Sequence, residues 1–428
     1  MRAVVLAGLG ALIAAGCMKT SEKFCAMHDD PRCPTTDGPI GNTCASSSEC
    51  AAPTPVCDVA GDKTCVACLS NTDCMAATAP VCSAVHTCGG CRVHDDCASS
   101  ACMPDGSCAA PTDVAYVDTV GGSGSGTCLK NDPCMKVSQG LMTLKKVIKL
   151  TGPNDEGVMI DDRAAGVTIL GGLNAQMFRN SGIVLDVKGS TNLTVVDVVI
   201  GSTVATNTTG ISLSAAASGT LELRRVRVQN NNAGAVRIQD GTLRMFDSMI
   251  LGNLGGGVTV STTALGYVIR NNFILGNGKA TGVNPGPSGT GGALLESVNG
   301  VFEFNTVALN SSSGTKRPGL HCEGAANSAT SNIVVGNTDQ LNGTQDGNQI
   351  NTANACAFGD TLKLGNGATL GFVSYGDPVD FHLTAASPTT VRDAAGDCGA
   401  VVPTDYDREP RPFGPACDLG ADEYRPAQ

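Results

Sequence analysis

Six segments between residues 193 and 337 align without gaps, and their shared pattern decides the fold of the chain. In order they are LTVVDVVIGST from Leu193, LELRRVRVQNN from Leu221, LRMFDSMILGN from Leu243, YVIRNNFILGN from Tyr267, GVFEFNTVALN from Gly300 and NSATSNIVVGN from Asn327. Their starts lie 28, 22, 24, 33 and 27 residues apart. Short apolar strands that recur at such a period, separated by Gly, Asn and Ser turns, are typical of the coils of a parallel β-helix.

Two columns of this alignment indicate how the coils are held together. The first column is aliphatic and contains Ile200, Val228, Ile250, Ile274, Val307 and Val334. The second column follows three residues later and contains Asn231, Asn253, Asn277, Asn310 and Asn337. Neighbouring coils lie about 4.8 Å apart, so like residues in one column touch. We expect the aliphatic column to stack inside, and the asparagines to bond from coil to coil while adopting the left-handed backbone of a tight turn.

The composition agrees with a repetitive all-β fold. The 428 residues include 54 Gly but no Trp, 5 Tyr and 10 Phe, so the core must be built from stacked aliphatic side chains. A leucine-rich repeat would show more leucine at a tighter period, and a propeller would show longer blades marked by aromatic residues. The formal net charge is −11 without a basic block, which argues against binding of nucleic acid.

The first residues predict export. Arg2 precedes an apolar run over residues 3–15, which is too short to span a bilayer but suits a secretory signal. The run ends in a sequence that resembles a bacterial lipobox, Leu12-Ile13-Ala14-Ala15-Gly16-Cys17, although Ala14 stands where leucine is more usual. We therefore expect a lipoprotein signal peptide over residues 1–16 and a tether lipidated at Cys17 over residues 17–43. The alternative is an ordinary signal peptide cut after a small residue.

The cysteine content supports export. The chain has 21 Cys, and behind a signal peptide so many cysteines indicate disulfides. Residues 44–110 contain three tandem units that are too poor in apolar side chains to fold without cross-links. Their cysteines are Cys44, Cys50, Cys57 and Cys65, then Cys68, Cys74, Cys82 and Cys88, then Cys91, Cys97, Cys102 and Cys108. The sequence leaves their connectivity open. Zinc bound by the two C-x-x-C pairs is the alternative, but each pair straddles a unit boundary.

The aligned segments resemble the pectin-lyase-like superfamily over roughly residues 114–370. The resemblance implies an all-β fold, a right-handed parallel β-helix, to which we assign residues 111–370. The tail contains Asp380-Phe381-His382-Leu383-Thr384 and the run from Asp418 to Tyr424, which resemble the C-terminal segments of exported β-helix proteins. This second resemblance implies a C-terminal cap segment over residues 371–428. The expected disulfides outside the tandem units are Cys128 with Cys134, Cys322 with Cys356, and Cys398 with Cys417.

The same resemblance leaves activity open, because the superfamily includes lyases, glycosidases, methylesterases and proteins without known catalysis. Asn337-Thr338-Asp339 and Asp161-Asp162 match two polygalacturonase-type strings, but they stand in reversed order. None of the five histidines lies in a G-H-G sequence. We interpret both matches as coincidences of turn chemistry.

A third column of the alignment supplies the catalytic candidates Asp197, Arg225 and Asp247. Glycosidic hydrolysis requires two carboxylates that flank the bond, and a lyase would combine acidic calcium ligands with a base. The alternative is a charge ladder that eases the stacking of coils. We favour the ladder, and the scarcity of Trp and Tyr also argues against a stacking platform for sugars.

These observations together predict a non-catalytic lipoprotein of the outer membrane or cell surface. Its β-helix would serve structural, adhesive, or glycan- or protein-binding roles. The alternative is a polysaccharide lyase or glycoside hydrolase that acts on acidic polysaccharide, and a third hypothesis is a receptor-like module that binds calcium or protein. The expected partners are the membrane, through the lipid on Cys17, and a polysaccharide or surface protein. No nucleic acid or cofactor is expected, with calcium the one ion left open.

Overall fold

The computed structural model describes most of the chain after residue 42. The described ranges are 43–201, 207–214, 216–278, 291–312, 318–324, 326–339, 356–376, 378–396, 398 and 401–426. They form two compact units, one up to Gly89 and one from Gly90 onward. The predicted signal peptide, Cys17 and nearly all of the tether lie outside these ranges. Within them, no helix has the length and apolar character needed to cross a membrane.

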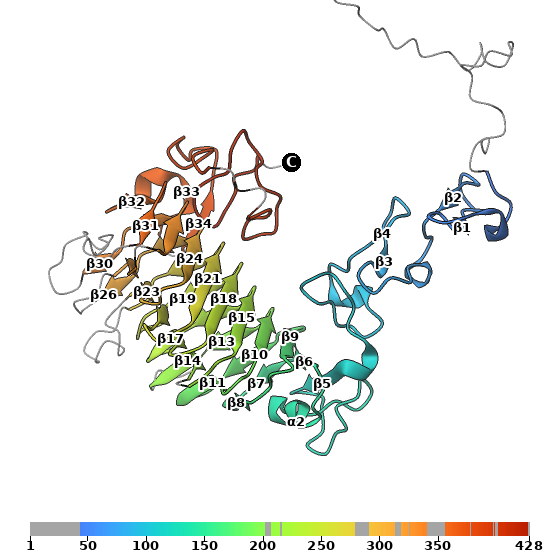
Figure 1. Ribbon diagram of the computed structural model, residues 1–428, viewed down its shortest axis with the longest axis horizontal. Helices are drawn as coiled ribbons and strands as arrows, with labels where there is room; N and C mark the ends of the chain where they lie inside the picture. The colour runs from blue at the N-terminus through green and yellow to red at the C-terminus, as the bar shows by residue number, and fades with distance from the viewer. Residues whose placement is uncertain are drawn as a thin grey trace, which may run out of the picture. The chain divides into compact units, whose positions relative to one another are not determined.

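The larger unit is a parallel β-helix, which confirms the predicted fold (Figure 1). A complete coil contributes one strand in turn to each of three long parallel sheets. The ten-stranded sheet contains β5 (Val114–Asp118), β6 (Val147–Thr151), β9 (Val167–Gly171), β12 (Leu193–Val196), β15 (Thr220–Arg224), β18 (Thr242–Phe246), β21 (Gly266–Arg270), β24 (Gly300–Glu303), β28 (Ser328–Thr330) and β31 (Ala357–Phe358).

The other two sheets close the coils. The nine-stranded sheet contains β7 (Pro153–Asn154), β10 (Gln176–Phe178), β13 (Val199–Gly201), β16 (Arg227–Gln229), β19 (Met249–Leu251), β22 (Phe273–Leu275), β25 (Thr306–Ala308), β29 (Ile333–Val335) and β32 (Leu362–Leu364). The seven-stranded sheet contains β8 (Val158–Asp161), β11 (Gly182–Lys188), β14 (Thr208–Leu213), β17 (Gly234–Ile238), β20 (Val258–Val260), β23 (Ala293–Leu295) and β27 (Leu320–Cys322). The short strands β26 (Ser311–Ser312) and β30 (Thr338–Asp339) pair beside them, and the helix α2 (Val137–Met142) contacts β5 and β6.

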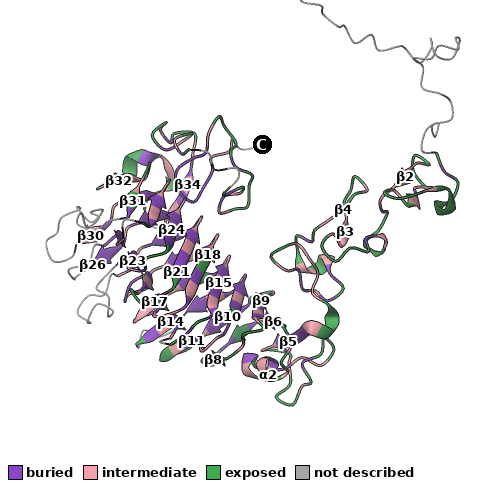
Figure 2. Ribbon diagram, in the orientation of Figure 1, coloured by how far each residue is buried: buried purple, intermediate pink, exposed green. Residues whose placement is uncertain are grey.

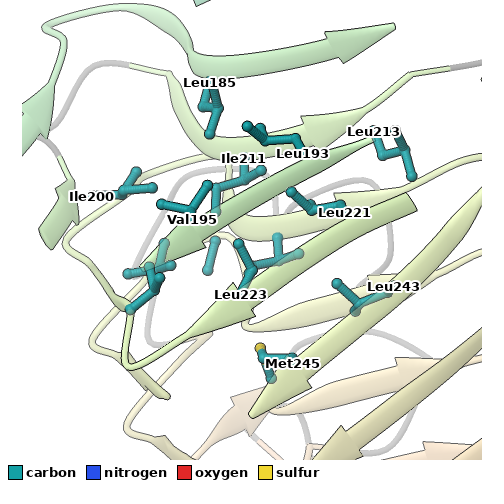
Figure 3. Close-up of a cluster of buried hydrophobic side chains, with 14 of the residues drawn as sticks. Leu185, Leu193, Val195, Ile200, Ile211, Leu213, Leu221, Leu223, Leu243 and Met245 are labelled. Carbon is teal, nitrogen blue, oxygen red and sulfur yellow. The ribbon is translucent and has the colours of Figure 1, made fainter. Parts of the chain in front are cut away.

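The core of the β-helix is the predicted aliphatic stack. Ile200 pairs in register with Val228, and the same column continues through Ile250, Ile274, Val307 and Val334. All six residues are buried. Figure 2 shows much of the coiled strands in the colour of buried residues. Residues from the other two sheets, such as Leu185 and Leu223, meet them in the interior (Figure 3). Full burial of each such side chain stabilises the folded state by about 1.5–3 kcal/mol, so the repeated column is a main source of the stability of the β-helix.

The asparagine column forms a continuous ladder of hydrogen bonds. The Oδ1 atom of Asn253 accepts from both the backbone N–H and the side-chain amide of Asn231, at 3.0 and 2.9 Å. The same double contact links Asn253 to Asn277, Asn277 to Asn310, and Asn310 to Asn337. All five asparagines are fully buried. Each buried amide forms hydrogen bonds with the asparagine of the adjacent coil, and the ladder therefore holds adjacent coils at a fixed spacing.

The predicted left-handed backbone of these asparagines is wrong. Positive φ angles belong instead to the residues directly before them, Asn230, Gly252, Gly276, Leu309 and Gly336. The left-handed residue turns the chain, and the next side chain therefore points inward, where its amide reaches the adjacent coil.

A second ladder lies five residues earlier in the coils. The backbone N–H of Ser248 donates to Oδ1 of Asn272. The double contact through backbone N–H and side-chain amide then links Asn272 to Asn305, and Asn305 to Asn332. Each again follows a left-handed residue: Asp247, Asn271, Phe304 and Ser331. Earlier coils place Val198 and Val226 at this position instead, so the column changes from aliphatic to polar along the β-helix.

The tandem units are closed by local disulfides. In each unit the first cysteine pairs with the third and the second with the fourth: Cys44–Cys57, Cys50–Cys65, Cys68–Cys82, Cys74–Cys88, Cys91–Cys102 and Cys97–Cys108. All four cysteines of the C-x-x-C pairs are thereby occupied, which removes the thiolates that the zinc alternative required. The smaller unit also contains β1 (Val56–Cys57), β2 (Cys65–Val66), β3 (Val81–Cys82), β4 (Cys88–Gly89) and the short helices η1 (Ser47–Glu49) and η2 (Asn71–Asp73).

The third tandem unit belongs to the larger unit and includes the short helix η3 (His94–Asp96). The Tyr116 hydroxyl donates to the carbonyl of Ser99 at 2.8 Å, and Lys130 Nζ donates to the carbonyl of Ala98 at 3.0 Å. The helix η4 (Pro111–Asp113) then leads into β5. These contacts fix residues 91–108 against the first coils.

The C-terminal segment covers the outer face of the nine-stranded sheet. After the helix η5 (Ala368–Leu370), the antiparallel strands β33 (Phe372–Ser374) and β34 (Asp380–Leu383) place Phe381 and Leu383 in one apolar cluster with Phe273 and Ile333. The three disulfides expected outside the tandem units are present: Cys128–Cys134, Cys322–Cys356 and Cys398–Cys417. Arg411 is fully buried in this segment, with Glu423 beside it.

Candidate functional site

The three candidate residues lie at successive turns between the ten-stranded and nine-stranded sheets. Asp197, Arg225 and Asp247 have φ angles of 57°, 53° and 51°. Because the residue after each of them points into the core, their side chains are directed outward. The structure thus brings the three candidates into one column on the surface of the β-helix.

Arg225 is paired with only one of its two acidic neighbours. Its Nε and Nη2 atoms donate to the two carboxylate oxygens of Asp197 at 2.6 and 2.8 Å. Such a two-point contact is among the stronger ion pairs in proteins. Asp247 instead accepts a hydrogen bond from the side chain of Asn271 at 3.3 Å.

The column forms part of a polar groove within the larger unit. One hollow of about 810 Å³ lies between the third tandem unit and the coils, and is lined by Lys149, Asp197, Arg225, Arg408 and His94 among others. A second hollow of about 220 Å³ is lined by Asp247, Tyr406 and Asp407, and shares Arg225 and Arg408 with the first. We call the two hollows together the polar groove.

Lys149 is the most perturbed base of the groove. It is buried at 6% exposure, and its Nζ donates to the carbonyl of Gly171 at 3.0 Å. Burial lowers the pKa of Lys149 to about 8, although Asp197 and Asp95 act in the opposite direction. A sizeable fraction of the amine is therefore neutral just above physiological pH.

His94 lies in the same hollow and is half-buried. Burial, followed by the charge of Lys149, lowers the pKa of His94. Its Nδ1 accepts a hydrogen bond from the backbone N–H of Cys102 at 3.3 Å. The ring is thus held as a neutral group that presents no additional positive charge at neutral pH.

Asp247 is expected to destabilise the folded chain when it ionises. Burial raises the pKa of Asp247 from 3.8 to about 6. The free energy of unfolding therefore falls by up to about 3 kcal/mol as the pH rises from below 4 to above 6 and the carboxyl group ionises. We predict that Asp247→Asn raises the free energy of unfolding by about 1–3 kcal/mol at pH 8 and leaves it unchanged near pH 4. Thermal unfolding of both proteins at the two pH values tests this, and an equal difference at both would contradict it.

The two polygalacturonase-type strings lie apart from the groove. Asn337 is the last residue of the buried asparagine ladder. The side chain of Asp162 accepts a hydrogen bond from the backbone N–H of Ser190 at 3.1 Å. Neither residue lines either hollow. Both have structural roles, in agreement with their interpretation as turn chemistry.

Sequence reasoning missed His94, Lys149 and Arg408. They come from the third tandem unit, from β6 and from the C-terminal segment, and no local spacing links them. The second asparagine ladder, in contrast, had a visible signal, because Asn272, Asn305 and Asn332 each precede a member of the first ladder by five residues.

Comparisons with known proteins give one structural likeness. No protein-family model matches the chain, and no curated protein matches it. Among solved structures, the chain is similar to one described as "Crystal structure of pectate lyase Pel9A", with 14% sequence identity and a TM-score of 0.47. The similarity covers 73% of this chain and 96% of that one. No residue of the groove takes a role from this likeness.

Proposed function

We propose that this chain is an exported, lipid-anchored surface protein whose β-helix binds acidic polysaccharide in the polar groove without cleaving it. The signal-like N-terminus and the dense disulfides support export. One observation carries the binding role: Lys149, Arg225 and Arg408, from three distant segments, line one groove.

Arg408 is suited to an incoming anion. Its side chain is exposed, and it forms no ion pair with any residue in the described ranges. Arg225 uses Nε and Nη2 for Asp197, so Nη1 takes no part in that ion pair. Guanidinium groups match the planar carboxylate of a uronic acid or the oxygens of a sulfate ester.

The carboxylates of the groove favour binding over hydrolysis. A glycosidase needs one protonated and one ionised carboxyl group on either side of the scissile bond. Asp247 meets the first requirement, because burial raises its pKa to about 6. The neighbouring Asp197 is committed to Arg225 and is not free to act as the ionised partner. The other carboxylates of the groove, Asp95, Asp105 and Asp407, are exposed. Among the lining residues described, Tyr406 is the one aromatic side chain, so charge and hydrogen bonds would hold the sugar.

A polysaccharide lyase is the second candidate, and Lys149 is the observation that favours it. A lyase needs a general base whose pKa lies near the working pH, and an amine with a pKa of about 8 meets that requirement. The two functions differ in their products, because a lyase releases unsaturated sugars and a binding protein releases none.

Binding is tested by titrating the full chain, in detergent, with oligogalacturonate, a sulfated oligosaccharide and a neutral glucan. We expect the acidic ligands to bind in a salt-dependent manner, with Arg408→Ala weakening binding about 5- to 10-fold. Arg237→Ala is the matched control, since Arg237 is also exposed but lines a separate hollow over the seven-stranded sheet.

Two outcomes would contradict the proposal. The first is binding that is equally weakened by both arginine variants or is absent for every acidic ligand. The second is the appearance of unsaturated products or reducing ends, with or without calcium, that Asp247→Ala or Lys149→Met abolishes. That second outcome would make the chain an enzyme.

A further inference from the structure

We infer that His382, Asp407 and Asp422 form a binding site for a divalent transition-metal ion, for which Zn²⁺ is the probe. One ligand atom from each of the three side chains lies within 4.8 Å of the other two. The residues come from β34, from the turn after Asp405 and from the end of the C-terminal segment. An ion at this point would join three separate stretches of chain. The inference does not depend on glycan binding.

The imidazole of His382 is oriented as a metal ligand requires. Its Nδ1 lies 2.5 Å from Oδ1 of Asp380, which fixes the ring and directs Nε2 to the opposite side. A carboxylate on the far nitrogen is the usual support of a metal-bound histidine, because it sets the tautomer and strengthens the ligand. The rings of Phe273 and Tyr406 pack against the imidazole edge-on, at 5.3 and 6.1 Å between centroids.

The second ring nitrogen faces Asp407. Nε2 of His382 is buried and lies 3.0 Å from Oδ2 of Asp407, so the two groups form an ion pair in the metal-free protein. A metal ligand must be deprotonated, and a divalent cation between Nε2 and the two carboxylates would replace the proton of this ion pair.

The two carboxylates differ in a way that suits the site. Asp422 is 6% exposed, and one of its oxygens accepts the backbone N–H of Leu383 at 2.6 Å, which holds the side chain in place. Asp407 is half-exposed and lines the smaller hollow of the polar groove. An ion held by these three residues would keep a position open to solvent at the groove.

The donor set selects the kind of ion. One imidazole nitrogen and two carboxylates suit Zn²⁺ or Mn²⁺, whereas Ca²⁺ prefers oxygen ligands alone and in greater number. Ligand atoms around one zinc ion lie roughly 3–3.6 Å apart, so the three atoms reach this geometry through small side-chain rotations.

Another histidine–carboxylate set provides a comparison. Glu296, His321 and Glu323 also bring their ligand atoms within 4.8 Å of one another. There, however, Nδ1 of His321 makes no hydrogen bond with any described residue. The ring therefore lacks the supporting carboxylate that Asp380 gives to His382, so we assign the ion to His382.

The experiment is zinc titration of the full chain by calorimetry, after removal of metals with a chelator and alkylation of free thiols. We expect one zinc ion to bind the wild-type chain and to raise its thermal unfolding midpoint. His382→Asn and Asp407→Asn should each weaken binding at least 100-fold, and Asp380→Asn should weaken it about 10- to 100-fold. Bound Co²⁺ should give a visible absorption that His382→Asn abolishes.

The controls make failure recognisable. His86→Asn removes a partly exposed histidine that lies 4.0 Å from Asp58 in the smaller unit, and it should leave the affinity unchanged. Asp407 is half-exposed, so its variant is expected to fold, and an unfolding midpoint without zinc equal to that of the wild type verifies this. Absence of a stoichiometric site, or a site that persists in both His382→Asn and Asp407→Asn, would overturn the inference.

Discussion

Replacing Asn310 by alanine is expected to lower the free energy of unfolding by about 3–5 kcal/mol. The Oδ1 atom of Asn310 accepts two hydrogen bonds from Asn277, and its Nδ2 donates to the carbonyl of Ile274 and to Asn337, all at 2.9 Å. The side chain is fully buried, so its loss leaves donors and acceptors of two adjacent coils unsatisfied. Each such group costs about 1–3 kcal/mol, and the sum is less than additive.

Chemical denaturation of the variant measures this effect. Asn299→Ala is the matched control, because Asn299 is exposed and makes one longer bond, 3.3 Å to the carbonyl of Leu265. We expect that control to lose less than about 1 kcal/mol. If both variants lost equal stability, the ladder would contribute nothing beyond an ordinary surface amide.

Replacing Arg411 by methionine is expected to cost a similar amount, about 3–5 kcal/mol, in the docking of the C-terminal segment. The side chain of Arg411 is 0% exposed and that of Glu423 is 1% exposed, with Nη1 lying 3.4 Å from Oε2. Arg411 also donates to the carbonyls of Asp418 and Gly420, and its guanidinium lies 4.9 Å from the centre of the Phe304 ring. Methionine fills the space but leaves a buried carboxylate and two carbonyls without their partner.

Proteolysis of the C-terminal segment and the thermal unfolding midpoint report the loss. Arg425→Met is the control, since Arg425 has an analogous glutamate and aromatic ring, Glu409 and Phe413, but its side chain is 24% exposed. We expect at most about 1 kcal/mol there. The double variant Arg411→Met with Glu423→Gln should recover part of the stability, because the unpaired charge is gone. No recovery would show that the hydrogen bonds to the carbonyls dominate.

The β-helix could be predicted from the sequence because its contacts repeat along the chain. Ile200 and Val228 are neighbours in the structure and also occupy one column of the alignment. The repeat in the sequence therefore predicts which residues are in contact. The same logic would have found the second ladder through Asn272. The backbone of the asparagines was misassigned because the turn residue and the inward residue are adjacent, and both accept asparagine, as Asn230 and Asn231 show.

The polar groove could not be predicted in the same way. His94, Lys149 and Arg408 meet because the third tandem unit and the C-terminal segment fold back onto the coils. Such contacts depend on the path of irregular chain, which no periodicity describes. The proposed metal site has the same origin, since Asp407 and Asp422 lie in turns of the tail, far from the repeats.

The disulfides of the tandem units have a consequence for how this chain can change over evolutionary time. Every bridge closes within its own unit, across 11 to 15 residues, so no bridge crosses a unit boundary. A whole unit can therefore be duplicated or deleted without stranding a thiol. The first two units meet this condition. The third unit differs, because Tyr116 and Lys130 hold its backbone and its loss would remove one wall of the groove.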